Sequence, residues 1–296
     1  MLRYRLLLGI LMTVFFTAVV IFDGWLDGSL TASVADDRAV QGTVFCILIA
    51  LLAIPAQLEL SKLGAAKNLK IFIPVSIIAS ILFATSRYWQ QEYWQRIIEI
   101  RPETYIIFLS VFVLLSLLLY QYISYGTSGV LANCGANYFS ILYLGLLSSF
   151  FVSIRLEFGL WPLLMFVFVV KSADIGAYAI GTSFGKHKFS PKISPSKSWE
   201  GMAGAVAMAV VVAILFAVIT AIYDIIIMAW WLAVIFGLCF AFIGQIGDLV
   251  ESMMKRDAEQ KDSSNKVPGF GGILDIIDSL LVSAPFGYLF FIVSLR

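Results

Sequence analysis

The chain has 296 residues, and its 20 Lys and Arg against 19 Asp and Glu leave a net charge of +1. Hydrophobic residues make up 60% of it and charged residues 13%, whereas a soluble domain has roughly 45–50% and about 25%. These values exclude a soluble globular enzyme, a disordered chain and a nucleic-acid-binding protein with a basic face. They indicate an all-α, polytopic integral membrane protein.

Apolar stretches recur along the whole chain. A helix needs about 20 mostly apolar residues to cross a bilayer, and a helix satisfies its own backbone groups in lipid. The sequence therefore predicts about nine transmembrane helices, at residues 4–22, 41–60, 69–86, 104–123, 137–154, 157–180, 200–222, 228–247 and 273–295. The first stretch is long for a signal peptide and no small-residue cleavage motif follows it, so we interpret it as an uncleaved helix.

Lys and Arg are unevenly distributed over the connecting segments. With nine helices, the Lys-rich segments fall on the same side as the N-terminus, and an acidic segment around Asp36 and Asp37, with Asp23 and Asp27, falls on the other side. Cytoplasmic loops of membrane proteins carry an excess of Lys and Arg. We therefore expect a cytoplasmic N-terminus and a multi-pass protein of the inner (cytoplasmic) membrane, with its active site facing the cytoplasm.

Ionisable residues at membrane depth are concentrated in the second half. Residues 1–155 predict transmembrane helices with little site chemistry, and residues 156–296 predict a catalytic transmembrane region with cytoplasmic basic loops. Such residues are costly in lipid and usually line a polar cavity, although helix pairing and snorkelling are alternatives. The second half contains Lys171, Asp174, Glu200, Asp248, Glu251, Asp275 and Asp278.

Residues 185–200 form a basic, Gly- and Ser-containing loop after Asp174. Lys side chains and glycine backbone N–H groups suit a polyanion, but a positive-inside loop that touches lipid headgroups would look the same. The single histidine, His187, gives little support for a site built on histidine.

Asp248, Glu251 and Lys255 would share one face of a helix, and Gly244 and Gly247 would let another helix approach closely. A carboxylate near a basic pair can hold a divalent cation on one side and phosphate on the other. The plain alternative is an amphipathic helix end with a Glu251–Lys255 pair.

A Pro-Gly-Phe-Gly-Gly turn at residues 268–272 opens the last predicted helix, where backbone N–H groups favour anions. Asp275 and Asp278 follow in its first turns. They could cap the helix dipole, but oxygen ligands facing a phosphate loop are what Mg²⁺ requires. Elsewhere, Gly201, Gly204 and Ala205 predict a close helix contact, either within the chain or between the protomers of a homodimer.

Residues 252–278 resemble the signature of phosphatidate cytidylyltransferases, also called CDP-diacylglycerol synthases. They read Ser-x-Met-Lys-Arg-x4-Lys-Asp-x-Ser-x2-Val-Pro-Gly-Phe-Gly-Gly-Ile-x-Asp-Ile-Ile-Asp. Ser-Pro-Ser-Lys-Ser-Trp-Glu-Gly at 194–201 and Asp-Ile-Gly-Ala-Tyr at 174–178 resemble two further blocks of that family. The chain departs from the family's usual pattern at Phe270, where the family has His, and at Ile276, where it has Arg.

The resemblance implies transfer of the cytidylyl group of CTP to phosphatidic acid, giving CDP-diacylglycerol and pyrophosphate in phospholipid synthesis. It implies Mg²⁺ as cofactor, with K⁺ as a candidate second cation. CTP, phosphatidic acid and membrane lipids are then the partners, and no nucleic acid is expected.

The resemblance also implies roles for individual residues. The expected catalytic residues are Asp248, Asp275, Lys255 and Lys261. The expected metal ligands are Asp248 and Asp275, with Asp278 and Asp174 as second choices. The expected substrate-binding residues are Lys197, Arg256, Asp262, Gly269, Gly271, Gly272, Asp174 and Ser196.

Two other functions remain as alternatives. A CTP-dependent polyprenol or phytol kinase would release CDP instead of pyrophosphate. A transporter of an anionic solute would usually show internal repeats with broken helices in both halves, whereas here the charged segments lie in one half only.

Overall fold

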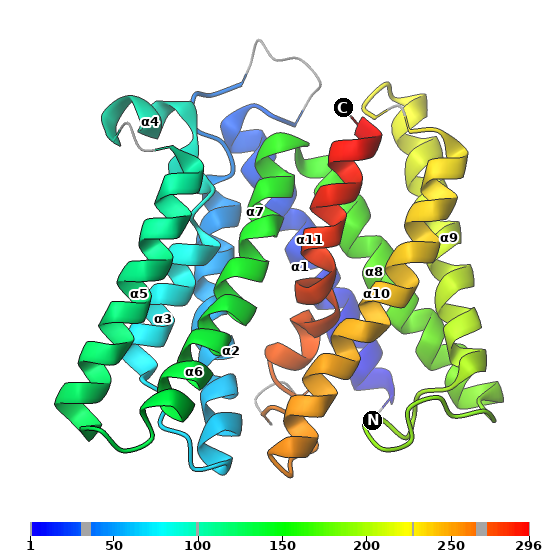
Figure 1. Ribbon diagram of the computed structural model, residues 1–296. Helices are drawn as coiled ribbons and strands as arrows, with labels where there is room; N and C mark the ends of the chain where they lie inside the picture. The colour runs from blue at the N-terminus through cyan, green and yellow to red at the C-terminus, as the bar shows by residue number, and fades with distance from the viewer. Residues whose placement is uncertain (1, 31–36, 99–100, 227, 265–270, 296) are drawn as a thin grey trace.

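The computed structural model of the protein describes residues 2–30, 37–98, 101–226, 228–264 and 271–295. These residues form a bundle of helices (Figure 1), and within these ranges there is no strand, only an isolated bridge between Lys188 and Ser198. The all-α prediction is therefore confirmed. The helices are α1 (Leu2–Asp27), α2 (Thr43–Ala66), α3 (Ile73–Ala84), η2 (Tyr88–Gln90), α4 (Glu92–Ile98), α5 (Pro102–Tyr125), α6 (Val130–Ile141), η3 (Leu142–Leu146), α7 (Leu147–Glu157), α8 (Leu160–Phe184), α9 (Trp199–Ile222), α10 (Trp230–Asp257) and α11 (Leu274–Leu295).

Within the described ranges, eight helical segments are long and apolar enough to cross a membrane, so the chain is a multi-pass membrane protein. One of them, Val130–Glu157, joins α6, the π-helical turn η3 and α7. The span expected at 69–86 is the 12-residue helix α3, which at 1.5 Å per residue is about 18 Å long, shorter than the hydrocarbon core of about 30 Å. The count of nine stays a prediction, although α1 begins and α11 ends at opposite ends of the bundle (Figure 1), as an odd number of crossings requires.

The basic loops meet at one end of the bundle, which we call the basic end. The start of α1 lies at this end together with the loops 67–72 and 185–198 and the residues that follow α10 (Figure 1). The cationic residues there include Lys67, Lys70, Lys186, Lys188, Lys192, Lys197, Arg256 and Lys261.

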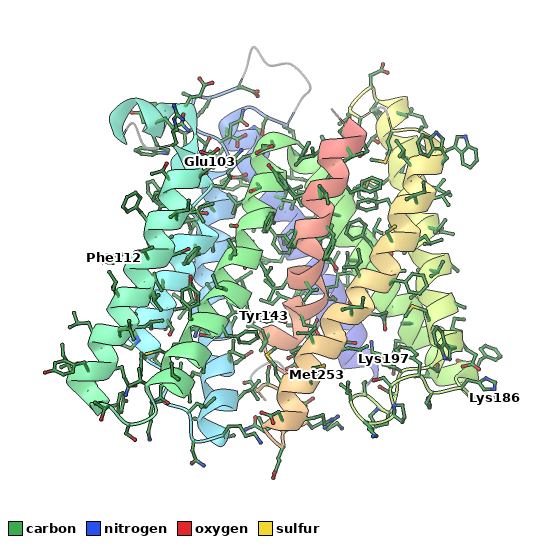
Figure 2. The ribbon with its side chains drawn as sticks, in the orientation of Figure 1. Glu103, Phe112, Tyr143, Lys186, Lys197 and Met253 are labelled. Atoms are coloured by element: carbon green, nitrogen blue, oxygen red, sulfur yellow. The ribbon has the colours of Figure 1, made fainter. Side chains whose placement is uncertain are left out.

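The outer faces of the bundle are apolar and its interior contains close helix contacts. Phe112 on α5 points away from the bundle (Figure 2) and is 66% exposed, as expected for a side chain that faces lipid. A Cβ on Gly204 of α9 would lie 2.6 Å from the carbonyl oxygen of Gly176 on α8. The contact expected at Gly201 and Gly204 is thus made within the chain, and this surface gives no reason to expect a homodimer.

An ion cluster at the other end of the bundle ties α1 to α7. Asp23 and Asp27 were expected in a loop, but both belong to α1 and both are buried. The Nε and Nη2 atoms of Arg155, which is fully buried, donate to Asp23 Oδ2 at 2.9 Å and to Asp27 Oδ2 at 2.8 Å. Asp23 also accepts the backbone N–H of Val44 at 2.8 Å, which satisfies a free donor at the start of α2.

Candidate active site

A glycine allows α10 and α11 to touch at the depth of the acidic residues. A Cβ on Gly247 would lie 2.8 Å from the carbonyl oxygen of Asp278 and 2.9 Å from the Cα of Ser279. Only glycine fits such a backbone contact, so the close approach predicted at Gly247 is confirmed. Asp248 is the next residue along α10, and the contact brings it opposite Asp278.

Three carboxylates lie together here, and we call them the acidic cluster: Asp248, Glu251 and Asp278. One oxygen of each lies within 4.8 Å of the others. Glu251 and Asp278 are buried, whereas the Asp248 side chain is 29% exposed. Carboxylate oxygens are the ligands that hard divalent cations prefer, so the acidic cluster has the chemistry to hold a metal ion.

The basic loop 185–198 reaches the acidic cluster through Lys197. Its Nζ forms an ion pair with Asp248 and donates to Gln245 Oε1 at 2.7 Å. The loop returns to the membrane at Ser198, whose hydroxyl accepts the backbone N–H of Gly201 and so caps α9. Because the cap fixes where α9 begins, it also fixes how far Lys197 can reach.

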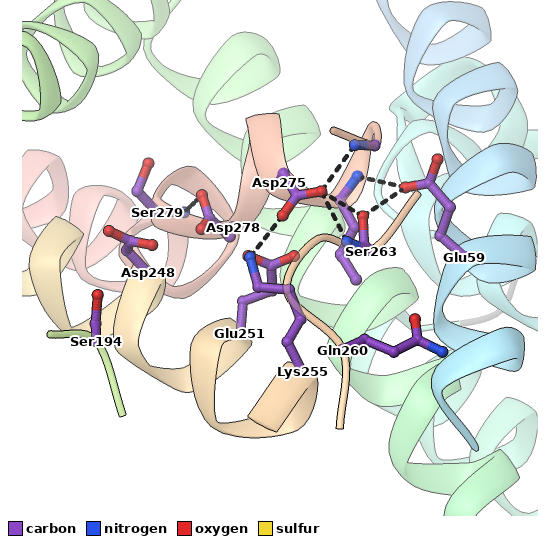
Figure 3. A network of polar contacts seen from close by, with 12 residues as sticks. Glu59, Ser194, Asp248, Glu251, Lys255, Gln260, Ser263, Asp275, Asp278 and Ser279 are labelled. Carbon is purple, nitrogen blue, oxygen red and sulfur yellow. Dashed lines mark hydrogen bonds and ion pairs between the residues drawn. The ribbon is translucent and has the colours of Figure 1, made fainter. Parts of the chain in front are cut away.

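A second lysine lies between the acidic cluster and Asp275. Lys255 Nζ contacts Glu251 Oε2 at 2.7 Å and Asp275 Oδ1 at 2.5 Å (Figure 3). Glu251 keeps one oxygen, Oε1, without a hydrogen-bond partner among the described residues. A fully buried carboxylate oxygen without a partner is costly, and a bound cation would satisfy it.

A third lysine lies on the other side of the acidic cluster. Lys171 Nζ contacts Asp174 Oδ2 at 3.0 Å and donates to the Ser279 hydroxyl oxygen at 2.8 Å. Ser279 in turn donates its hydroxyl proton to Asp174 Oδ2 at 2.9 Å and its backbone N–H to Asp278 Oδ1 at 2.6 Å. Asp174 is therefore linked to the acidic cluster through α11.

The charges around the acidic cluster do not cancel. Six carboxylates meet three ammonium groups, which leaves three negative charges when all are ionised; the groups are Glu59, Asp174, Asp248, Glu251, Asp275 and Asp278 with Lys171, Lys197 and Lys255. A divalent cation would offset most of this excess. The charge, the unpartnered oxygen of Glu251 and the set of oxygen ligands all fit a metal ion at this position.

Asp275 lies outside the acidic cluster and holds Ser263 and Gly272, which precede α11. Its Oδ2 accepts the backbone N–H of Gly272 at 2.7 Å and the Ser263 hydroxyl proton at 2.6 Å (Figure 3). The N–H of Gly272, expected to face a phosphate, is thus engaged within the protein. The structure brings Asp278, a second choice of the sequence analysis, to Asp248; a ligand role for Asp275 stays a prediction.

Glu59 of α2 is a residue that sequence reasoning did not identify. It is fully buried, its Oε2 accepts the Leu274 N–H at 2.9 Å, and the same oxygen lies 3.2 Å from the Ser263 hydroxyl oxygen, whose one proton it shares with Asp275 (Figure 3). A Cβ on Gly272 would lie 2.2 Å from the same oxygen, so a side chain at this position would displace the Glu59 carboxylate. The available signal was an acidic residue inside the apolar run 41–60.

The other predicted site residues lie on the surface of the basic end or near Asp275. Gly271 has a φ of +98°, and a Cβ on it would lie 2.5 Å from Asp275 Oδ2. The Nε of Arg256 donates to the Ile193 carbonyl oxygen at 3.2 Å, which links α10 to the basic loop. Gly269 and Phe270 lie outside the described residues. The exposed predicted residues are Ser196, Arg256, Lys261 and Asp262.

Comparison with known proteins gives consistent matches. The sequence model of the cytidylyltransferase family matches residues 4–294. A phosphatidate cytidylyltransferase of Haemophilus influenzae is 45% identical over 139 residues, which cover 46% of this chain and 47% of that protein. Those of Bacillus subtilis and Pseudomonas aeruginosa are 38% identical over 152 residues (50% and 54% of the two chains) and 46% identical over 130 residues (42% and 47%). The chain thus aligns with about half the length of these curated relatives.

Proposed function

This chain belongs to the cytidylyltransferase family, and on that premise we propose that it transfers the cytidylyl group of CTP to phosphatidic acid, giving CDP-diacylglycerol and pyrophosphate. The observation that carries the proposal is the acidic cluster of Asp248, Glu251 and Asp278, which lies beside Lys197 and Lys255 toward the basic end of a membrane protein. The relatives named above are phosphatidate cytidylyltransferases, which supports the choice of substrates.

The basic end lies at the cytoplasmic face of the inner membrane in this proposal. An excess of Lys at that end supports the orientation. CTP then reaches the acidic cluster from the cytoplasm, and phosphatidic acid enters sideways from the adjoining leaflet.

The reaction exchanges one phosphorus–oxygen bond for another. A phosphate oxygen of phosphatidic acid attacks the α-phosphorus of CTP, and the bond to the β-phosphate breaks, so its electron pair leaves with pyrophosphate. The attacking oxygen is already ionised near pH 7, so no strong general base is required. Repulsion between the two anions is the main obstacle, and electrostatic stabilisation is the main demand on the protein.

The charged residues divide this work. Asp248, Glu251 and Asp278 would hold Mg²⁺, which neutralises phosphate charge when bound. Lys197 pairs with one carboxylate and Lys255 with two, and both ammonium groups are on flexible side chains that can turn to a phosphate. The proposal also includes Mg²⁺ as the identity of this cation and K⁺ as a candidate second cation. Both are tested by measuring turnover after each ion is replaced by another.

The positions of Ser263 and Gly272 depend on Asp275. By accepting from both residues and pairing with Lys255, Asp275 holds them beside α10. Arg256 and Lys261, exposed at the basic end, are available to the triphosphate that enters there.

The test is a turnover assay of the purified protein in detergent micelles that contain phosphatidic acid, with CTP labelled in the α-phosphate. We expect Asp248→Asn and Asp278→Asn to lose Mg²⁺-dependent transfer of label into lipid. Asp257→Asn is the matched control, because Asp257 lies on the same helix but pairs with Lys67 at the surface. Full activity of Asp248→Asn would exclude its ligand role, and release of CDP without pyrophosphate would exclude the proposed reaction in favour of a kinase.

A further inference from the structure

The turn that joins α6 to α7 departs from the α-helix. Residues Leu142–Leu146 form the π-helical turn η3, and such turns are rare and frequently lie at functional sites. A Cβ on Gly145 would lie 2.7 Å from the Ser80 carbonyl oxygen, so the backbone of α3 packs directly against the turn. This contact fixes the register of η3 and with it the direction of the Tyr143 side chain.

The Tyr143 hydroxyl is buried without a partner. The residue is 6% exposed, and no atom among the described residues forms a hydrogen bond with its hydroxyl. Buried tyrosine hydroxyls normally have a hydrogen-bond partner, and an unpaired one lowers stability. Phenylalanine would fill the same apolar space without this cost, so the hydroxyl indicates a partner beyond the described residues.

The surroundings of the hydroxyl indicate what that partner is. The carboxylates of Asp278, Glu251 and Asp248 act on it electrostatically, yet none of them accepts its proton. Figure 2 shows Tyr143 at the level of the first turns of α11, where Asp278 lies. A neutral donor at the level of carboxylates that can hold a cation suits an anion brought there by that cation.

We propose that the Tyr143 hydroxyl donates a hydrogen bond to a phosphate oxygen of a substrate held at the acidic cluster. The inference rests on the proposed function for the identity of the substrates. The phosphate belongs either to the lipid or to the nucleotide, which share this chemistry. Tyr143 thus adds a substrate-binding residue from the N-terminal half, where the sequence predicts little site chemistry.

Tyr143→Phe tests the inference because it removes the hydroxyl and leaves the ring. We expect kcat/KM to fall by about tenfold or more, since a hydrogen bond to a charged oxygen has that strength. The thermal midpoint of unfolding should stay the same or rise, because an unpaired buried group is lost. If the hydroxyl had a purely structural role, Tyr143→Phe would lower the thermal midpoint and leave kcat/KM unchanged. Tyr138→Phe, on α6 and partly exposed, is the matched control.

The arms of the experiment identify the phosphate. A rise in KM for phosphatidic acid at saturating CTP assigns the bond to the lipid, and a rise in KM for CTP assigns it to the nucleotide. Unchanged kinetics for both substrates in an active preparation would overturn the inference and leave the proposed function intact.

A binding measurement distinguishes a failure of this inference from a failure of the proposed function. Inorganic pyrophosphate with Mg²⁺, and separately phosphatidic acid in micelles, should raise the thermal midpoint of the unmodified protein more than that of Tyr143→Phe. If the protein lacked turnover but showed this difference, the proposed function would fail and the inference would stand. Equal shifts in both proteins, or no shift in either, would overturn the inference.

Discussion

Replacing Gly247 by alanine adds one methyl group where α10 meets α11. Its Cβ would lie 2.8 Å from the carbonyl oxygen of Asp278, whereas ordinary contact begins at 3.4 Å, so the oxygen must move by about 0.6 Å. The contacted atoms are backbone atoms, which cannot rotate away. The movement therefore displaces the turn of α11 that carries Asp278 away from Asp248.

The expected loss of activity is larger than the loss of stability. Overpacking lowers the free energy of unfolding by about 1–3 kcal/mol, whereas replacing a helical glycine by alanine raises it by about 1 kcal/mol. The net destabilisation is therefore about 0–2 kcal/mol. A misplacement of about 1 Å at a reacting centre costs roughly 100-fold in rate. For the smaller displacement at Gly247 we expect kcat to fall by about tenfold or more.

Gly135→Ala is the control for the helix propensity of alanine. Gly135 lies within α6, and a Cβ there would meet no atom within 4 Å. The free energy of unfolding of this variant should rise by about 1 kcal/mol, and its activity should not change. Both variants are compared by initial rates of CDP-diacylglycerol formation and by thermal unfolding in the same detergent. Gly247→Ala with unchanged kcat and unchanged Mg²⁺ dependence would refute the reasoning.

Three further predictions concern charged residues. Glu59→Gln keeps an acceptor for the Leu274 N–H, so its kcat should fall only a few-fold. Glu59→Ala leaves that buried N–H unpaired, so its kcat should fall about tenfold or more. Equal kcat values for the two variants would contradict a positioning role for Glu59. Arg155→Met leaves two buried aspartates without their cation and should lower the free energy of unfolding by about 3–5 kcal/mol, as measured by denaturant titration, while the folded fraction keeps its specific activity. Lys197→Met should raise KM for CTP by about tenfold and lower the Mg²⁺ concentration for half-maximal rate, because one cation near Asp248 is removed; a steady-state titration of both ligands checks the two opposite changes.

The sequence predicted the long helices well because every helix that crosses a membrane needs about 20 mostly apolar residues. Apolar length identified the long helices, but α3 is short because Pro74 lies at its start and the polar pair Thr85 and Ser86 follows its end. The helix contacts at Gly204 and Gly247 were also predictable, because a glycine inside a helix bundle lets two backbones approach closely.

The arrangement of the site was less predictable. Asp275 and Asp278 are neighbours on one helix, and only the rotation of α11 against α10 decides which of them lies beside Asp248. That rotation is set by the contact of Gly247 with Ser279, which no local pattern specifies. Glu59 was missed for a similar reason, because its partner Leu274 is 215 residues away in the chain.

The link between Glu59 and Leu274 also has a consequence for biosynthesis. Glu59 belongs to α2, whereas the backbone N–H that it binds belongs to the 22-residue helix α11, which the ribosome makes much later. Asp278 arrives with that same helix. A nascent or truncated product that lacks α11 is therefore missing both the Leu274 N–H that Glu59 binds and one carboxylate of the acidic cluster.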